Sequence, residues 1–385
     1  MLATTPTLEL LDRLVSFDST SRNSNLGLIE IIRLYLAEHG VPCELVYDDS
    51  GTKANLYATL GPQDRAGIAL LGHTDVVPVD GQTWSSDPFR LHCSDGRYYG
   101  RGTCDMKGFI AAVLGFVPRW MNTTLNTPLH LCFTYDEEVG CLGVRRLLGE
   151  LKHRAVRPRL AIVGEPTEMR VITAHKGKTS RRCHVHGHAC HSSLAPQGVN
   201  AVQYAAHLIV LLDRLAAEKV EQGPFDHDFD VPFSTVHTGV VSGGTALNIV
   251  PADCSFDFEI RNLPGDDPEP LLDILERRAE ELRQIMRRIS PEADIQFEPL
   301  SAFAALDMAP GAEVVTLAKG LVGANGHGKV AFGTEAGLMA EAGIPAVVCG
   351  PGSIAQAHKP DEFVSADQLA LCERFLDRLT ERAAA

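Results

Sequence analysis

Residues 129–143 read LHLCFTYDEEVGCLG, an apolar run that ends abruptly in three consecutive acids, Asp136, Glu137 and Glu138. The apolar run has the length and composition of a buried strand, and a helical pattern, GVRRLLGELKH, follows it. Burying a carboxylate without a partner is costly, and packed carboxylates repel one another. The three acids therefore either face water in a loop or surround a positive charge.

The same alternation of strand and helix continues on both sides of this stretch. Short β-like runs, CELVY, ANLYATL, GIALLG and LAIVGE, are interleaved with helical patterns such as NLGLIEIIRLYLAEHG and MKGFIAAVLGFVPRW. Continuous apolar strands between helices are typical of an α/β domain whose sheet is largely buried.

The middle of the chain has a different pattern. From about residue 178 to residue 300 the order strand, helix, strand, strand, helix, strand predicts a ferredoxin-like α+β domain. The α/β pattern resumes after it. We therefore predict one α/β domain, residues 1–176 and 301–385, interrupted by an inserted domain, residues 177–300.

Composition limits the classes of function. The chain has 385 residues, 45% of them hydrophobic, and its net charge of −14 disfavours nucleic acids and anionic membranes as partners. Its longest apolar runs are too short to cross a bilayer, and its N-terminus lacks the basic patch of a secretory signal. Ten cysteines without any C-x-x-C pair indicate reduced thiols. We expect a cytoplasmic protein.

Polar residues that can bind metals follow the ends of several predicted strands: His73 and Asp75 in LLGHTDVVP, Asp105 in GRGTCDMKG, Glu165 in AIVGEPT and His358 in GPGSIAQAHKPDEF. Each alone is more often a turn, a helix cap or a solvated loop. Together they favour one divalent metal site, because ligands of α/β sheets collect at the carboxyl ends of the strands. Imidazole and carboxylate suit zinc, cobalt or manganese, whereas a structural zinc site of the cysteine type would need thiolate pairs.

Five segments in this order, GHTDVVP, GRGTCDMKG, TYDEEVG, VGEPT and QAHKPDEF, resemble the ligand-bearing motifs of the dinuclear-zinc amidohydrolases and peptidases. This family includes acetylornithine deacetylases, succinyl-diaminopimelate desuccinylases and glutamate carboxypeptidases. The resemblance covers essentially the whole chain, and AHKG and FGTEA are most similar to the first group. It implies an α/β, metallopeptidase-like catalytic domain, with a mixed sheet flanked by helices, and an inserted ferredoxin-like lid and dimerisation domain.

The resemblance also implies a ligand set for two divalent ions, Zn²⁺ or alternatively Co²⁺. Asp105 would bridge the two ions. His73 and Glu165 would complete the protein ligands of one ion, and Glu138 with His358 those of the other.

Further roles near the metals follow from the same resemblance. Asp75 would hold the His73 imidazole in its ligating tautomer, and the peptide bond after Asp105 would be cis. Glu137 would be the general base, taking a proton from the attacking water and handing it to the departing amine. Asp136 is then left with a structural role.

Substrate contacts are implied in the inserted domain and beside it. His191 matches a histidine that reaches across a dimer interface into the partner's active site, where it would stabilise the oxyanion. Arg261 would bind the substrate carboxylate, with Asn248 as a companion contact, although without the resemblance Arg261 reads as a surface ion pair. Gly333 and Thr334 would line the pocket.

Glu335, in the FGTEA motif, and a row of three histidines are two further features of the sequence. We hypothesise that Glu335 binds the δ-ammonium group of the substrate, since the cationic end of acetylornithine needs a partner. His184, His186 and His188 lie at alternate positions of a predicted strand, and we interpret them as a surface row rather than a second metal site.

The function implied is hydrolysis of N2-acetyl-L-ornithine to L-ornithine and acetate, in arginine biosynthesis, by a homodimer. One alternative is a deacylase of another N-acyl amino acid, such as acetylcitrulline or succinyl-diaminopimelate. Another is a metal-dependent dipeptidase or aminopeptidase, although aminopeptidase relatives tend to carry Asp at the position of Glu165. A binding protein without activity would be expected to lack a ligand or the base.

Overall fold

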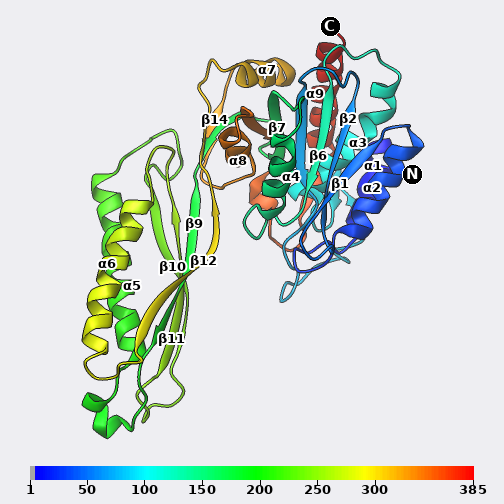
Figure 1. Cartoon of the computed structure of the whole chain (residues 1–385). Helices are drawn as coiled ribbons and strands as arrows, with labels where there is room; N and C mark the ends of the chain where they lie inside the picture. Colours follow the sequence, from blue (N-terminus) through cyan, green and yellow to red (C-terminus); the bar gives the residue numbers. More distant parts are fainter. Residues whose placement is uncertain (1–4) are drawn as a thin grey trace. The chain divides into compact units, whose positions relative to one another are not determined.

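The computed structural model of the chain describes residues 5–385 (Figure 1). Contacts divide them into two compact units. The first unit comprises the residues up to Ala174, Leu306–Lys329 and Thr334–Ala385, and the inserted unit comprises His175–Ala305 and Val330–Gly333.

These bounds differ slightly from the predicted ones, 177 and 300, for identifiable reasons. The last strand of the inserted unit, β12 (Asp294–Phe303), continues three residues beyond residue 300. Gly333 joins this unit because it packs on Phe303 so closely that a Cβ atom would lie 1.9 Å from the ring.

The first unit is built on a nine-stranded sheet in the order β1-β2-β6-β3-β7-β15-β8-β13, with β14 paired to β8. Its strands are β1 (Cys43–Tyr47), β2 (Ala54–Leu60), β3 (Ile68–His73), β6 (Leu129–Thr134), β7 (Leu160–Pro166), β8 (Ile172–His175), β13 (Leu306–Asp307), β14 (Gly328–Val330) and β15 (Ala346–Gly350). The four central strands β6, β3, β7 and β15 run parallel, and all their residues are buried. Buried parallel strands require helices on both faces of the sheet.

Helices cover the sheet as this requirement predicts. They are α1 (Pro6–Val15), α2 (Leu26–Glu38), α3 (Gly108–Met121), α4 (Leu142–Lys152), α7 (Glu313–Val322), α8 (Ala336–Glu341) and α9 (Ala366–Ala384). Helices α1, α3 and α9 pack together in one layer, and α4 contacts α8 in another (Figure 1). Helix α1 was not expected from the sequence pattern, although Thr5 caps its first turn by accepting the Leu8 N–H. No helix among residues 5–385 is long and apolar enough to cross a membrane.

A small antiparallel sheet completes the first unit. It joins β16 (Phe363–Ser365) to β5 (Arg97–Tyr99) and β4 (His92–Ser94). The short helical turn η1 (Thr103–Lys107) follows β5 in the chain, and η3 (Ile354–Gln356) precedes β16. The pairing of β16 with β5 ties the segment after His358 to the segment before Asp105.

The inserted unit has the predicted order of elements. These are β9 (Lys178–His186), the short turn η2 (Ser192–Gln197), α5 (Ala201–Gln222), β10 (Thr235–Gly243), β11 (Asp253–Arg261), α6 (Glu269–Met286) and β12. The strands form an antiparallel sheet in the order β10-β11-β9-β12, the arrangement of a ferredoxin-like fold, with α5 and α6 packed on one face (Figure 1). Alternate residues of β9 and β11 point into that core.

Candidate metal centre

Three parallel strands deliver their last residues to one edge of the sheet. His73 ends β3, Glu165 lies at the end of β7, and the acids that follow Thr134 continue from β6. Because β3 pairs in parallel register with both neighbours, these ends are adjacent. The site therefore lies where α/β sheets usually bind ligands.

His73 lies between carboxylates from two other elements. Its Nε2 is 3.0 Å from Asp105 Oδ1 and 3.5 Å from Glu165 Oε1. Two groups of three side chains bring their ligand atoms within 4.8 Å of one another: His73 with Glu137 and Glu165, and His73 with Asp105 and Glu138. The structure thus brings residues from four separate sequence motifs into one cluster.

His358 joins the cluster from the opposite side of Asp105. Its Nε2 lies 3.1 Å from Glu138 Oε2 and 3.4 Å from Asp105 Oδ2. Asp105 therefore presents one oxygen to each imidazole, which is how a carboxylate shared between two ions would be arranged. The peptide bond from Asp105 to Met106 is cis, as expected.

Asp75 organises the cluster through both its main chain and its side chain. His73 Nδ1 donates a hydrogen bond to the Asp75 main-chain carbonyl at 2.9 Å, while the Asp75 carboxylate lies farther from Nδ1, at 3.6 Å. The carboxylate instead accepts the backbone N–H groups of Glu137 and Glu138, at 3.1 and 3.3 Å, and the hydroxyl of Ser21 at 2.7 Å. It therefore fixes the bend that carries the two glutamates.

Electrostatics at the cluster are dominated by buried negative charge. Burial alone would lower the pKa of His73, but Glu165, Asp105 and Asp75 raise that pKa well above its ordinary value. Burial raises the pKa of Glu137 and of Glu165 well above the usual range, and neighbouring carboxylates add to both shifts. These groups need a positive charge among them.

Divalent cations fit this need. Within residues 5–385, the ion pairs of Asp105, Glu138 and Glu165 are with the two imidazoles. Carboxylate oxygens and imidazole nitrogens are the donors that zinc and cobalt bind. Charge and donor chemistry thus fit divalent cations in this cluster, and the assignment of ligands to two ions that the resemblance implies stays a prediction.

Asp136, the first of the three acids, has a protein partner of its own. The Lys53 ammonium group lies 2.5 Å from Asp136 Oδ1 and also donates to the Ser21 carbonyl. The three consecutive acids are therefore neutralised in different ways. Asp136 pairs with a lysine, whereas Glu137 and Glu138 join the cluster.

Sequence reasoning did not single out several residues that support the site. Lys53 and Ser21 lie far from the motifs in sequence, and nothing in their local pattern distinguishes them. Glu362 and Arg101 are different, because each stands inside a quoted motif, QAHKPDEF or GRGTCDMKG. The presence of these two charged residues inside the motifs was the signal that could have identified them as supporting residues.

The inserted unit holds four of the residues predicted to contact the substrate: His191, Asn248, Arg261 and Gly333. His191 is exposed, its Nδ1 lies 2.8 Å from the Ser193 hydroxyl, and the adjacent Ser192 N–H donates to the Asn248 carbonyl at 3.0 Å. The His191 and Asn248 segments are thus neighbours. Arg261, at the end of β11, donates from Nε to Glu259 at 3.0 Å.

The residues of the FGTEA motif are more enclosed than expected. Thr334 is fully buried, and its hydroxyl accepts the Ala336 N–H at the start of α8. Glu335 is also fully buried; it accepts a hydrogen bond from the Thr134 hydroxyl at 2.9 Å, and burial raises its pKa to about 7. A buried side chain tied to the sheet does not offer an ammonium group an open surface, so the structure disfavours our hypothesis for Glu335.

The histidines of β9 lie on the exposed face of their strand. His184 pairs with Glu298 and His186 with Asp253, at 3.0 and 2.8 Å. Among the described residues, the groups of three potential ligands both contain His73 and neither includes this row.

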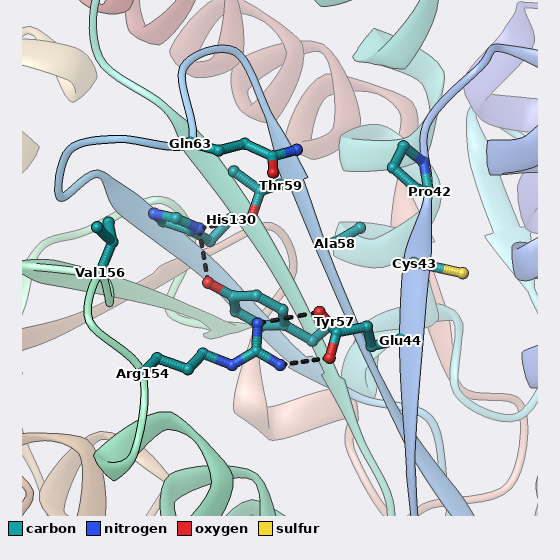
Figure 2. Close-up of a pocket in the computed structure, with 10 residues that line it drawn as sticks. All are labelled: Pro42, Cys43, Glu44, Tyr57, Ala58, Thr59, Gln63, His130, Arg154 and Val156. Carbon is teal, nitrogen blue, oxygen red and sulfur yellow. Dashed lines mark hydrogen bonds and ion pairs between the residues drawn. The ribbon is translucent and has the colours of Figure 1, made fainter.

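A cavity of about 320 Å³ lies elsewhere on the first unit and contains none of the predicted site residues (Figure 2). Its buried imidazole, His130, lies at the start of β6, 2.8 Å from the Tyr57 hydroxyl. Glu44 and Arg154 form a bidentate ion pair beside it, at 3.0 and 2.5 Å. The charges drawn in Figure 2 are therefore already paired within the protein.

Comparisons with known proteins agree with this geometry. The family model of peptidase family M20/M25/M40 matches residues 69–382. Acetylornithine deacetylase of Myxococcus xanthus is 38% identical over 374 residues, which cover 96% of this chain and 95% of that protein.

Solved structures show the same fold. An M20 family metallo-carboxypeptidase from Sulfolobus solfataricus superposes with a TM-score of 0.78 at 17% identity, over 99% of this chain and 100% of that one. A dinuclear metal-binding peptidase of the same family from Bacillus subtilis gives a TM-score of 0.64 at 16% identity, over 97% and 96% of the two chains. The predicted fold class is confirmed.

Proposed function

The chain belongs to peptidase family M20/M25/M40 and is a metal-dependent hydrolase, and we propose that it converts N2-acetyl-L-ornithine and water to L-ornithine and acetate. The substrate is proposed from the acetylornithine deacetylases at 33 to 38% identity that match nearly the whole chain. We further propose that it works in the cytoplasm, in arginine biosynthesis, as a homodimer.

The observation that carries the proposal is the cluster of buried acids around His73 and His358. Asp105, His73 and Glu165 would hold one ion, and Asp105, Glu138 and His358 the other. When bound, two divalent ions supply Lewis acidity, which makes a water molecule more acidic and polarises the amide carbonyl.

Glu137 is the residue that we propose as general base. Its carboxylate is as near to His73 and Glu165 as a ligand would be, so proximity alone does not separate a ligand from a base. Two features favour the base. Glu138, the next residue, already faces His358 and Asp105. The Asp75 carboxylate also holds the backbone of the bend at both glutamates, which fixes the position of Glu137 beside the cluster.

The proposed proton path uses the Glu137 carboxylate twice. It takes a proton from the attacking water as the new C–O bond forms, and it gives that proton to the amine nitrogen as the C–N bond breaks. Glu137 thus returns to its starting protonation state. The proton left on the new carboxyl group goes to the released amine, so that acetate and an ammonium group leave as products.

Substrate recognition is proposed for the inserted unit. The planar guanidinium group of Arg261 suits bidentate binding of an α-carboxylate, with Asn248 as a further polar contact. His191, exposed on a segment hydrogen-bonded to that of Asn248, would donate to the oxyanion of a partner subunit's site. Gly333 would contribute its backbone to the pocket.

The test is a kinetic panel on the purified chain with zinc or cobalt added. The substrates are N2-acetyl-L-ornithine, acetylcitrulline, succinyl-diaminopimelate, and di- and tripeptides, and the expected result is the highest kcat/KM for acetylornithine. A higher kcat/KM for a peptide would overturn the proposal in favour of a peptidase. A preference for another acyl amino acid would retain the chemistry and replace the substrate.

A further inference from the structure

The Glu362 side chain lies four residues after His358 and is almost completely buried, with 1% of its surface exposed. Its Oε1 accepts the backbone N–H groups of Cys104 and Asp105, at 2.9 and 3.0 Å. Its Oε2 accepts the Gly102 N–H at 3.0 Å and the Arg101 guanidinium at 2.7 Å. One carboxylate thus receives four hydrogen bonds from residues of a single turn.

That turn is the one that presents Asp105 to the cluster. Inside η1 the backbone leaves helical geometry, with φ and ψ of −123° and 92° at Asp105 and −135° and 35° at Met106. An irregular buried turn lacks the regular partners of a helix, and an unpaired buried N–H group costs about 1–3 kcal/mol. Glu362 supplies those partners from the His358 side of the site.

Arg101 extends the connection to the main chain beside His358. Its Nη1 donates to the Lys359 carbonyl at 3.3 Å as well as to Glu362, and its Nη2 donates to Gln82 Oε1 at 2.6 Å. Gln82 in turn donates from Nε2 to the His358 carbonyl at 2.9 Å. A continuous set of hydrogen bonds therefore joins the turn of Asp105 to the backbone that carries His358.

Neither Glu362 nor Arg101 belongs to the groups of potential metal ligands among the described residues. Arg101 is 1% exposed and neutralises Glu362, so the pair adds no net charge beside Asp105. A buried ion pair also contributes little net stability, because desolvation offsets its Coulombic attraction. Its main consequence is therefore geometric: it sets the distance between two segments that each carry a metal-binding side chain.

We propose that Glu362 is a positioning residue that, together with Arg101, holds Asp105 and His358 at the spacing that lets the site bind two ions at once. This inference rests on the proposed two-metal function. It predicts that loss of the carboxylate weakens chiefly the ion shared by Asp105, Glu138 and His358, because the other ion draws its remaining ligands from β3 and β7.

The experiment is a calorimetric titration of the metal-free, full-length chain with Co²⁺, for the wild type, Glu362→Gln and a matched control, Glu373→Gln. Glu373 also accepts a hydrogen bond within the first unit, from Thr7 at 2.5 Å, but lies outside the metal centre. We expect two equivalents in the wild type and in the control. In Glu362→Gln we expect one equivalent of unchanged affinity and a second weakened by about 10–100-fold.

Kinetics supply a second readout. At limiting Co²⁺ the kcat of Glu362→Gln should fall in parallel with the occupancy of the second ion, and excess Co²⁺ should restore it, with KM unchanged throughout. Gln82→Met leaves the Glu362–Arg101 ion pair in place and removes the hydrogen bonds through which Gln82 joins Arg101 to the His358 carbonyl. It should weaken the second ion alone, and it carries the test if Glu362→Gln does not fold.

The outcomes distinguish a failure of the positioning role from a failure of the proposed two-metal function. Two wild-type ions together with two unaltered ions in both Glu362→Gln and Gln82→Met would overturn the positioning role alone. Equal weakening of both ions in parallel with a lowered Tm would also overturn it, because that pattern is a general loss of stability. Fewer than two ions in the wild type would overturn the proposed function and this inference with it.

Discussion

His73 and His130 are buried imidazoles on adjacent parallel strands, one at the carboxyl end of β3 and the other at the amino end of β6. Burial and the charge of Arg154 lower the pKa of His130 to about 4, so it is neutral. Burial acts on His73 as well, but there the neighbouring acids outweigh it and raise the pKa.

The two ends of the sheet differ in which groups neutralise the buried carboxylates. Near His130 the carboxylate of Glu44 has a bidentate arginine partner (Figure 2). Near His73 the carboxylates of Asp105, Glu137, Glu138 and Glu165 gather around imidazoles alone within the described residues. Buried charge that the protein leaves unmatched indicates a bound cation, whereas buried charge that is already paired does not.

Glu137→Gln should have the largest effect on activity. Because the amide cannot accept and return a proton, we expect kcat to fall by about 10²–10⁴-fold. Metal content should remain that of the wild type, since this substitution removes no proposed ligand. Steady-state kinetics and elemental analysis of one sample check both points, and a loss of bound metal would reassign Glu137 as a ligand.

The His130 end of the sheet should show a pH-dependent stability without any metal. Its folded-state pKa of about 4 lies below the ordinary value of 6.5. As the pH falls from 6.5 to 4, His130 is protonated in the unfolded chain but stays largely neutral in the folded chain. The folded state therefore loses up to about 3 kcal/mol of stability. In urea unfolding, His130→Gln should lose that much less than the wild type between pH 7 and pH 4. Parallel losses in the two proteins would contradict the assignment.

Metal removal should affect only the His73 end. Free Zn²⁺ at a hundred times its dissociation constant should raise the free energy of unfolding of the metal-free chain by about 2.7 kcal/mol for each ion. Thermal unfolding should show the same increase in His130→Gln and about half of it in His73→Ala, which removes a proposed ligand of one ion only. An equal increase in His73→Ala would place the stabilising ion elsewhere.

Asp136→Asn should have the smallest effect on catalysis, although it lies beside Glu137. Its partner is Lys53, and its side chain is outside the ligand groups. We expect a kcat within about threefold of the wild type and a loss of unfolding free energy of about 1–3 kcal/mol, because Asn leaves the mostly buried Lys53 ammonium group without its charged partner. A kcat loss as large as that of Glu137→Gln would mean that the bend, rather than the individual acid, determines activity.

The sequence predicted most of the fold because its strands are continuous apolar runs. β1 and β2 have the expected bounds, and the inserted unit has the expected order of elements. Helix α1 was missed, and so was the small sheet, whose three-residue strands are too short to show a period.

The site was predictable where a residue's own motif revealed it. His73, Asp105, Glu138 and His358 each stand in a motif, and the structure gathers them. Contacts between residues that are distant in the sequence could not be predicted from local motifs. Lys53 lies 83 residues before its partner Asp136 in the sequence. The Asp75 carboxylate accepts a backbone N–H group of the glutamate bend, and a pattern of side chains cannot reveal a contact with the backbone.

Two divalent ions holding the acids and imidazoles together are the central proposal for this protein. Anomalous diffraction at the zinc absorption edge, on crystals of the purified chain, tests it most directly. We predict two peaks, one within about 2.0–2.2 Å of His73 and Glu165 and one within the same range of Glu138 and His358, with Asp105 touching both. An absence of peaks in this cluster, or zinc found instead at His184 and His186, would contradict the account.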